Sequence, residues 1–228
     1  MRNENPGTFL QTDDEFLLAC IHDIRLHLRK SLTSAQMLER QISNSLPHDA
    51  RANLDGVLAS NRDIEMLLTR LAQYAAAGSM AAGKSSAKLG IIFDSAIRRL
   101  ADRNRDANID AQALYMCPII APYSCEIVLR ELLDNALKFR QGRVQINIRV
   151  EQSPDKTVLG ISDTGIGFDP QFCEKIMRPL ERLHSADTYP GCGLGLAICQ
   201  RTVHSWGGSL WAESQPGSGS TFWFDLPL

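Results

Sequence analysis

A heptad-like repeat of mostly apolar residues fills the first third of this 228-residue chain. The repeated positions alternate between steps of four and three residues, which is the spacing of a helix that buries one narrow face. The first series is Leu17, Ile21, Ile24, Leu28, Ser31, Ala35, Leu38 and Ile42. The second series is Leu54, Val57, Asn61, Ile64, Leu68, Leu71 and Ala75. Between them, NSLPHDA contains Pro47 and Asp49, which suit a turn and a helix start, so residues 13–77 are predicted to form a helical hairpin.

Two helices alone bury little apolar surface, and this hairpin has apolar residues beyond its two seams. These additional residues are Phe16, Leu32, Leu58 and Leu67. A homodimer that forms a four-helix bundle would bury them, so we predict one. Asn61 on the second seam would lower the stability of such a bundle but could fix its register.

Composition limits the other possibilities. The net charge of −2 gives no basic field for nucleic acid or an anionic membrane. The six cysteines lack metal-ligand spacing, and a reducing compartment is expected. Residues 1–12 are polar and predicted to be flexible, and no apolar run is long enough to cross a membrane. We therefore expect a cytoplasmic chain without a membrane segment, whose sensor is on another segment or another protein.

The residue pattern changes after a linker rich in Gly, Ser and Ala, predicted at residues 78–86. Helical patterns are expected at residues 93–103, 123–140 and 196–206, and strand patterns at 107–114, 144–152, 157–163, 209–214 and 220–226. Two pairs of neighbouring strands are predicted to form hairpins. This mixture predicts an α+β fold for residues 87–228, in which helices cover one face of a mixed sheet.

Four motifs in this second region suit a nucleotide. In ELLDNALKF, Glu131, Asn135 and Lys138 share one helix face. The Asn135 amide oxygen suits Mg²⁺ and the Lys138 ammonium suits phosphate, although such a face alone could simply be solvated. In DTGIGF, Asp163 ends a strand and could accept a hydrogen bond from the exocyclic amine of adenine, while Gly165 and Gly167 allow close backbone approach.

The third motif, GCGLGLAI, places glycines before a helix, where backbone N–H groups bind phosphate. The fourth, GSGSTF, places a Thr at the start of the final strand. In this order and spacing, the four motifs resemble the N box and glycine boxes of sensor histidine kinases, especially the phytochrome-related type. That family shares its ATP-binding fold with gyrase, mismatch-repair and heat-shock chaperone ATPases. The resemblance covers roughly residues 87–228.

The resemblance implies a role for each matching residue. Asn135 would hold Mg²⁺, Glu131 would orient water or metal, and Asp163 would read adenine. The other residues expected to contact or shape the ATP site are Lys138, Phe139, Gly165, Gly167, Gly193, Leu194, Gly195 and Thr221. The residues between the glycine boxes would form a mobile lid, from which Arg178 and Arg182 could reach the γ-phosphate. The lid sequence IMRPL departs from the family pattern I-F-E-P-F, so lid docking is expected to differ.

An ATP site on the same chain singles out one histidine of the helical hairpin. His22 and Asp23 match the first two positions of the family acceptor pattern H-[ED]-[LI]-R-[TS]-P-L, with five of its seven positions matched. The imidazole of His22 would attack the γ-phosphate, and Asp23 would fix its tautomer and accept its proton. Leu26 stands where relatives with phosphatase activity have a water-orienting Thr, Ser or Asn, and His27 replaces a proline.

The sequence therefore predicts a homodimeric, ATP-dependent histidine autokinase with weak or no phosphatase activity, which receives a signal from a sensor and relays phosphate to a response-regulator receiver domain. Two alternatives stay open. One is a catalytically silent, dimeric scaffold that binds ATP and signals by shape. The other is a serine kinase of the anti-sigma type on the same fold.

Overall fold

In the computed structural model, the described residues are 6–42, 47–79, 86–101, 106–116, 119–185 and 188–227. The chain divides into two compact units, Met1–Ala76 and Ala77–Leu228. Residues 80–85 of the predicted linker, residues 1–5 and residues 43–46, which include the first three residues of NSLPHDA, lie outside the described residues.

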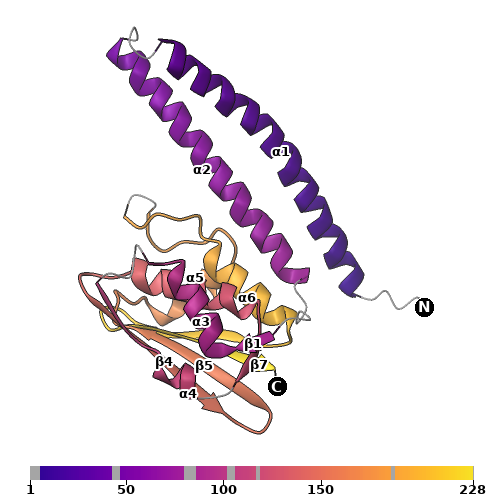
Figure 1. The fold of residues 1–228 in the computed structure, drawn as a ribbon, viewed down its shortest axis with the longest axis vertical. Coiled ribbons are helices and arrows are strands. Elements are labelled where there is room, and N and C mark those ends of the chain that lie inside the picture. The colour runs from indigo at the N-terminus through magenta and orange to yellow at the C-terminus, as the bar shows by residue number, and fades with distance from the viewer. Residues whose placement is uncertain are drawn as a thin grey trace. The chain divides into compact units, whose positions relative to one another are not determined.

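The first unit is a pair of long helices, α1 (Pro6–Ile42) and α2 (His48–Ser79), which lie side by side (Figure 1). Helix α1 begins at Pro6, before the predicted start at residue 13. Ile21, Ala35 and Leu68 of the two seams are buried, and so is Leu58, which was predicted outside the seam. A hydrogen bond of 3.0 Å from the Arg25 guanidinium to Thr69 Oγ1 adds a polar link between α1 and α2.

The second unit is an α+β fold, as predicted. Its helices are α3 (Leu89–Arg98), α4 (Gln112–Met116), α5 (Cys125–Lys138) and α6 (Gly195–Ser205). Its strands are β1 (Ser86–Lys88), β2 (Ala107–Asp110), β3 (Ile120–Pro122), β4 (Val144–Gln152), β5 (Lys156–Asp163), β6 (Leu210–Gln215) and β7 (Gly219–Pro227). Helices α3, α5 and α6 lie on one face of the large sheet (Figure 1), and the buried core fills the layer between.

The large sheet has the strand order β2-β4-β5-β7-β6. Strand β2 is parallel to β4, and the other neighbouring pairs are antiparallel, so the sheet is mixed. The two predicted hairpins are β4-β5 and β6-β7. A separate two-stranded sheet, in which β1 pairs with β3, is not evident from the sequence pattern.

In the second unit, two predicted elements differ from the structure. The segment 107–114, predicted as one strand, is strand β2 followed by helix α4. The change occurs because the Asp110 carboxylate accepts a hydrogen bond from the Gln112 N–H at 3.2 Å, a local contact that ends a strand. Helix α3 begins at Leu89 rather than at Phe93, because the apolar run 89–93 supplies its buried face.

Candidate functional site

The predicted adenine end of the site is built where α5 and β5 both end. The carboxylate of Asp163, the last residue of β5, accepts a hydrogen bond from the Gly165 N–H at 2.7 Å. The carbonyl of Phe139, which follows α5, accepts one from the Ile166 N–H at 3.0 Å. A Cβ on Gly165 would lie 2.6 Å from Asp163 Oδ1 and would also strike the Phe139 carbonyl, so only glycine fits there.

Asp163 has a perturbed acidity. Burial raises the pKa of this carboxyl from its ordinary 3.8 to about 6, while backbone N–H groups of Gly165 and Ser220 act in the opposite direction. At neutral pH the group is therefore ionised but incompletely solvated. An acceptor in this state has a strong preference for a ligand N–H, and the exocyclic amine of adenine is such a donor.

The sheet register separates Thr221, which was predicted to assist Asp163, from that residue. Asp163 pairs with Ser220 across β5 and β7, while Thr221 pairs with Ser162. Because side chains alternate along a strand, the side chain of Thr221 is on the opposite sheet face from that of Asp163. The hydroxyl of Thr221 indeed lies 2.9 Å from that of Ser162. Ser220 is the residue beside Asp163, and the sheet register is what identifies it.

The predicted phosphate end brings α5 to the second glycine box. The Lys138 ammonium lies 4.5 Å from the centroid of the Phe139 ring, and a Cβ on Gly191 would be 2.8 Å from Lys138 Nζ. Asn135 is half-buried one turn earlier on α5, and Glu131 is buried one turn before that. The face that the sequence predicts for metal and phosphate is thus assembled next to a glycine-rich loop.

The second glycine box leads directly into a helix. Gly193 has a φ of 71°, and a Cβ there would lie 2.7 Å from the Glu181 carbonyl, so glycine allows the lid backbone to approach. Gly195 begins α6. The side chain of Leu194 is fully buried, which leaves only its backbone available to a nucleotide. The start of α6 can bind phosphate through such backbone groups.

The lid between the glycine boxes carries residues that the sequence analysis did not single out. The Tyr189 ring packs against Phe139 with centroids 5.0 Å apart, and His184 lies 5.3 Å from Tyr189 and 6.1 Å from Phe139. The Arg182 guanidinium donates to the Tyr189 carbonyl at 2.8 Å, so here it holds the lid backbone. Arg178 is exposed just after a short 3₁₀ turn, Lys175–Met177.

His22 and Asp23 lie on α1, in the other compact unit. Both side chains are 81% exposed, and Nδ1 of His22 is 3.4 Å from Asp23 Oδ1. Exposure follows from the position of His22 next to the buried seam residue Ile21. If Nδ1 carries the proton toward Asp23, Nε2 keeps its lone pair and remains open to solvent.

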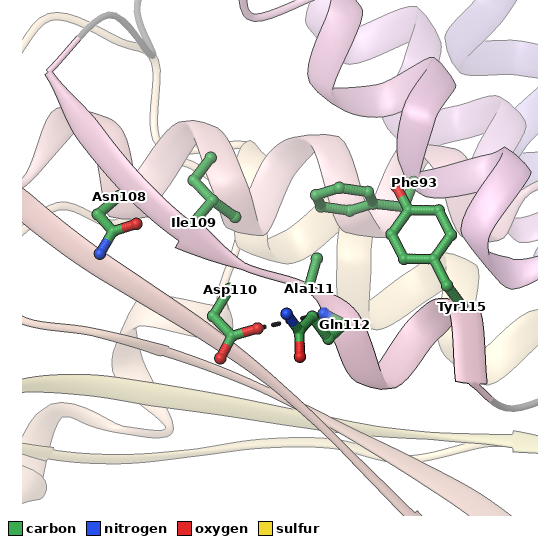
Figure 2. Close-up of a pocket in the computed structure, with 7 residues that line it drawn as sticks. All are labelled: Phe93, Asn108, Ile109, Asp110, Ala111, Gln112 and Tyr115. Carbon is green, nitrogen blue, oxygen red and sulfur yellow. Dashed lines mark hydrogen bonds between the residues drawn. The ribbon is translucent and has the colours of Figure 1, made fainter.

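A further hollow of about 490 Å³ opens beside the edge strand β2 (Figure 2). Residues 108–112 line it together with Phe93 and Tyr115. The Tyr115 hydroxyl donates to Asp94 Oδ1 at 2.6 Å, so one of its polar groups is already paired within the protein. The lining of the hollow includes none of the residues predicted to bind ATP, so the hollow is separate from the predicted nucleotide site.

Together, Asp163, the two glycine boxes and the polar face of α5 can hold an adenine nucleotide with its phosphates. Comparison with known proteins agrees: residues 122–228 match the model of the histidine kinase-, DNA gyrase B- and HSP90-like ATPase family. The resemblance to sensor histidine kinases that the motifs indicate is confirmed by the relatives of this chain.

The relatives extend over almost the whole chain. Phytochrome-like protein Cph1 of Synechocystis sp. is 30% identical over 94% of this chain, which corresponds to 29% of Cph1. Sensor histidine kinase AruS of Pseudomonas aeruginosa is 28% identical over 93% of this chain and 22% of AruS. Adaptive-response sensory kinase SasA of Synechococcus sp. is 27% identical over 96% of this chain and 60% of SasA. The chain therefore spans only part of the length of these relatives.

Solved structures show the same fold. Full-length ShkA in complex with AMPPNP has a TM-score of 0.71 at 23% identity, over 93% of this chain and 45% of the ShkA chain. The mycobacterial sensor histidine kinase MprB has a TM-score of 0.53 at 25% identity, over 63% of this chain and 96% of the MprB chain. In the part of this chain that the structure describes, no helix is both long and apolar enough to cross a membrane.

Proposed function

We propose that this chain is an ATP-dependent protein histidine autokinase that phosphorylates His22 and relays the phosphate to an aspartate of a response-regulator receiver domain. The observation that carries the proposal is the exposed His22–Asp23 pair on a chain that also contains the ATPase domain. The match to this ATPase family indicates nucleotide binding but does not identify the residue that accepts the phosphoryl group. The histidine with an adjacent carboxylate supplies one.

In this proposal, the two ring nitrogens of His22 have different tasks. Nδ1 faces Asp23, which orients the ring and takes the Nδ1 proton. Nε2 attacks the γ-phosphorus of ATP, and the Nδ1 proton passes to Asp23 as positive charge develops on the ring. A bond forms between Nε2 and phosphorus, the bond from phosphorus to the β–γ bridging oxygen breaks, and ADP leaves with that electron pair. The product is a phosphoramidate, which has the transfer potential needed to phosphorylate an aspartate.

ATP and Mg²⁺ are the proposed ligands of the ATPase domain. Asp163 selects adenine, and Lys138 with the backbone of Gly193 and Gly195 contacts phosphate. No group of three or more His, Cys, Asp or Glu side chains suited to a metal occurs among the residues that the structure describes. The Asn135 amide, together with phosphate oxygens and water, is the donor set proposed for Mg²⁺. Bound Mg²⁺ would neutralise developing charge on the phosphates.

A second copy of the chain is the proposed partner of the helical hairpin. Within one hairpin, the seam residues Ile24, Leu38, Val57 and Ile64 remain between 43% and 49% exposed. Pairing of two hairpins into a four-helix bundle would bury them. Relatives named as sensory kinases support two further proposed partners, an upstream sensor and a response regulator. Leu26, which cannot orient water, supports weak or absent phosphatase activity.

The test is labelling with γ-labelled ATP and Mg²⁺, followed by acid and alkali treatment of the protein. We expect acid-labile, alkali-stable label on the wild type and on His27→Ala, a matched control with an exposed histidine on the same helix. His22→Ala should take no label. Label that survives His22→Ala would refute the proposal and favour another acceptor. Absence of label on a wild type that binds ATP would favour a silent scaffold.

A further inference from the structure

Glu131 belongs to a row of alternating charges that crosses the start of α5. The Arg130 guanidinium donates through Nη2 to Glu131 Oε1 at 3.3 Å, and its Nη1 lies 3.9 Å from Glu126 Oε1. Glu126 Oε1 is in turn 3.2 Å from Nε of Arg99, the residue that caps the C-terminus of α3. Only the Glu126–Arg130 pair has the helical i,i+4 spacing.

Burial decides which of these charges depend on their neighbours. The side chains of Glu126 and Glu131 are only 11% and 7% exposed, whereas that of Arg99 is 63% exposed. A buried carboxylate keeps its charge and its position only where cations or donors replace the lost water. Arg130, 22% exposed, reaches both carboxylates with the two ends of one planar fork. Its own orientation is therefore fixed from two sides.

We infer that Arg130 is a positioning residue for Glu131. The inference rests on the proposed function, in which the Glu131 carboxylate orients water or metal near the phosphates. Arg130 holds this carboxylate in one rotamer, on the face of α5 that also presents Asn135 and Lys138. Glu126 and Arg99 keep the guanidinium in place. Arg130 itself is assigned no contact with ATP.

A residue that acts in this way affects the rate of phosphoryl transfer more than the affinity for ATP. Loss of the guanidinium allows the Glu131 carboxylate to rotate, and a displacement of about 1 Å in a reacting constellation can lower the rate by roughly a hundredfold. We expect Arg130→Met to lower the maximal rate of His22 labelling by about tenfold or more. The KM for ATP should stay within about twofold, because the residues at the adenine and phosphate ends are unchanged.

The experiment measures initial rates of labelling against ATP concentration on the full chain. Arg130→Met removes the charge, and Arg130→Lys restores a cation without the planar fork. Arg130→Lys should recover part of the lost rate. Arg149→Met, an exposed arginine of β4, is the matched control and should behave as the wild type. Binding of a fluorescent ATP analogue and circular dichroism establish that each variant is folded, and Arg130→Gln replaces Arg130→Met if that variant does not fold.

A maximal rate that matches the wild type in Arg130→Met would overturn the inference while leaving the proposed kinase intact. A rise in KM with an unchanged maximal rate would also overturn it, because Arg130 would then bind nucleotide directly. A rate loss that Arg130→Lys does not relieve at all would count against a charge-dependent role. A wild type that takes no label would refute the proposed function, and the inference with it.

Discussion

Replacement of Asp163 by asparagine should stabilise the ATP-binding unit and, at the same time, weaken its binding of ATP. The carboxylate is held in a site that removes much of its water, which is why its pKa is raised from 3.8 to about 6. The substituted asparagine would be neutral, and its side-chain oxygen can still accept the hydrogen bond that Gly165 N–H makes at 2.7 Å. The variant would, however, lose the ionised acceptor for the adenine amine.

The sign and size of the stability change follow from linkage. Because the folded-state pKa is the higher one, the folded protein binds the proton more tightly, and ionised Asp163 lowers the free energy of unfolding. This destabilisation is largest above pH 6 and disappears as the pH falls toward 3.8. The shift corresponds to about 3 kcal/mol at pH 8 and to about half of that at pH 5.

Urea unfolding of wild type and Asp163→Asn at pH 8 and pH 5 measures this effect. The variant should be more stable by up to about 3 kcal/mol at pH 8, and its advantage should fall by roughly half at pH 5. Asp155→Asn, in the exposed turn between β4 and β5, is the control and should change neither value. A variant that is less stable than wild type at pH 8, or equally stabilised at both pH values, would refute this reasoning.

The same pKa predicts how ATP binding depends on pH. In the proposed contact, the ionised carboxylate is the stronger acceptor for the adenine amine, and its fraction falls about tenfold between pH 7 and pH 5 when the pKa is about 6. Wild-type affinity for a fluorescent ATP analogue should fall by about the same factor. Asp163→Asn should bind weakly with no such pH dependence.

Two further perturbations test the lid and the hairpin. Tyr189→Ala removes the ring that packs 5.0 Å from Phe139. Such a pair contributes about 0.5–1.5 kcal/mol, so the lid should open more readily and the association rate of an ATP analogue should rise by about two- to tenfold in stopped-flow measurements. Tyr123→Ala serves as the control, and an unchanged or slower rate would contradict this role. Asn61→Leu replaces a buried amide that donates a hydrogen bond of 2.8 Å to the Val57 carbonyl, within its own helix. It should raise the thermal stability of the hairpin by about 1 kcal/mol through apolar burial, and a lower melting temperature by circular dichroism would contradict this.

Local features of the chain could be predicted well because they depend on neighbours in sequence. The period of the two seams predicted both long helices, and alternation predicted the two hairpins β4-β5 and β6-β7. The motif residues of α5 and of the glycine boxes were predicted to gather at one site, and the structure brings Lys138 to Gly191 and Phe139 to Gly165. The prediction of a single strand at 107–114 was wrong, because the Asp110 carboxylate accepts a hydrogen bond from the Gln112 N–H and this local contact outweighs the weak apolar pattern of the segment.

The sequence by itself thus determined the two-part architecture, the nucleotide motifs and the histidine proposed as acceptor. The tertiary structure decided which residues contact the residues of the nucleotide motifs. Sheet register puts Ser220, not Thr221, opposite Asp163. Lid packing brings Tyr189 to Phe139, and the approach of α3 to α5 joins Arg99 and Glu126 to the Arg130–Glu131 pair. The residues joined by these contacts are 27 to 57 positions apart in the sequence. The choice between Ser220 and Thr221 also depends on a register shift of one residue, which moves a side chain to the other face of the sheet. Local periodicity predicts neither the long-range contacts nor the register.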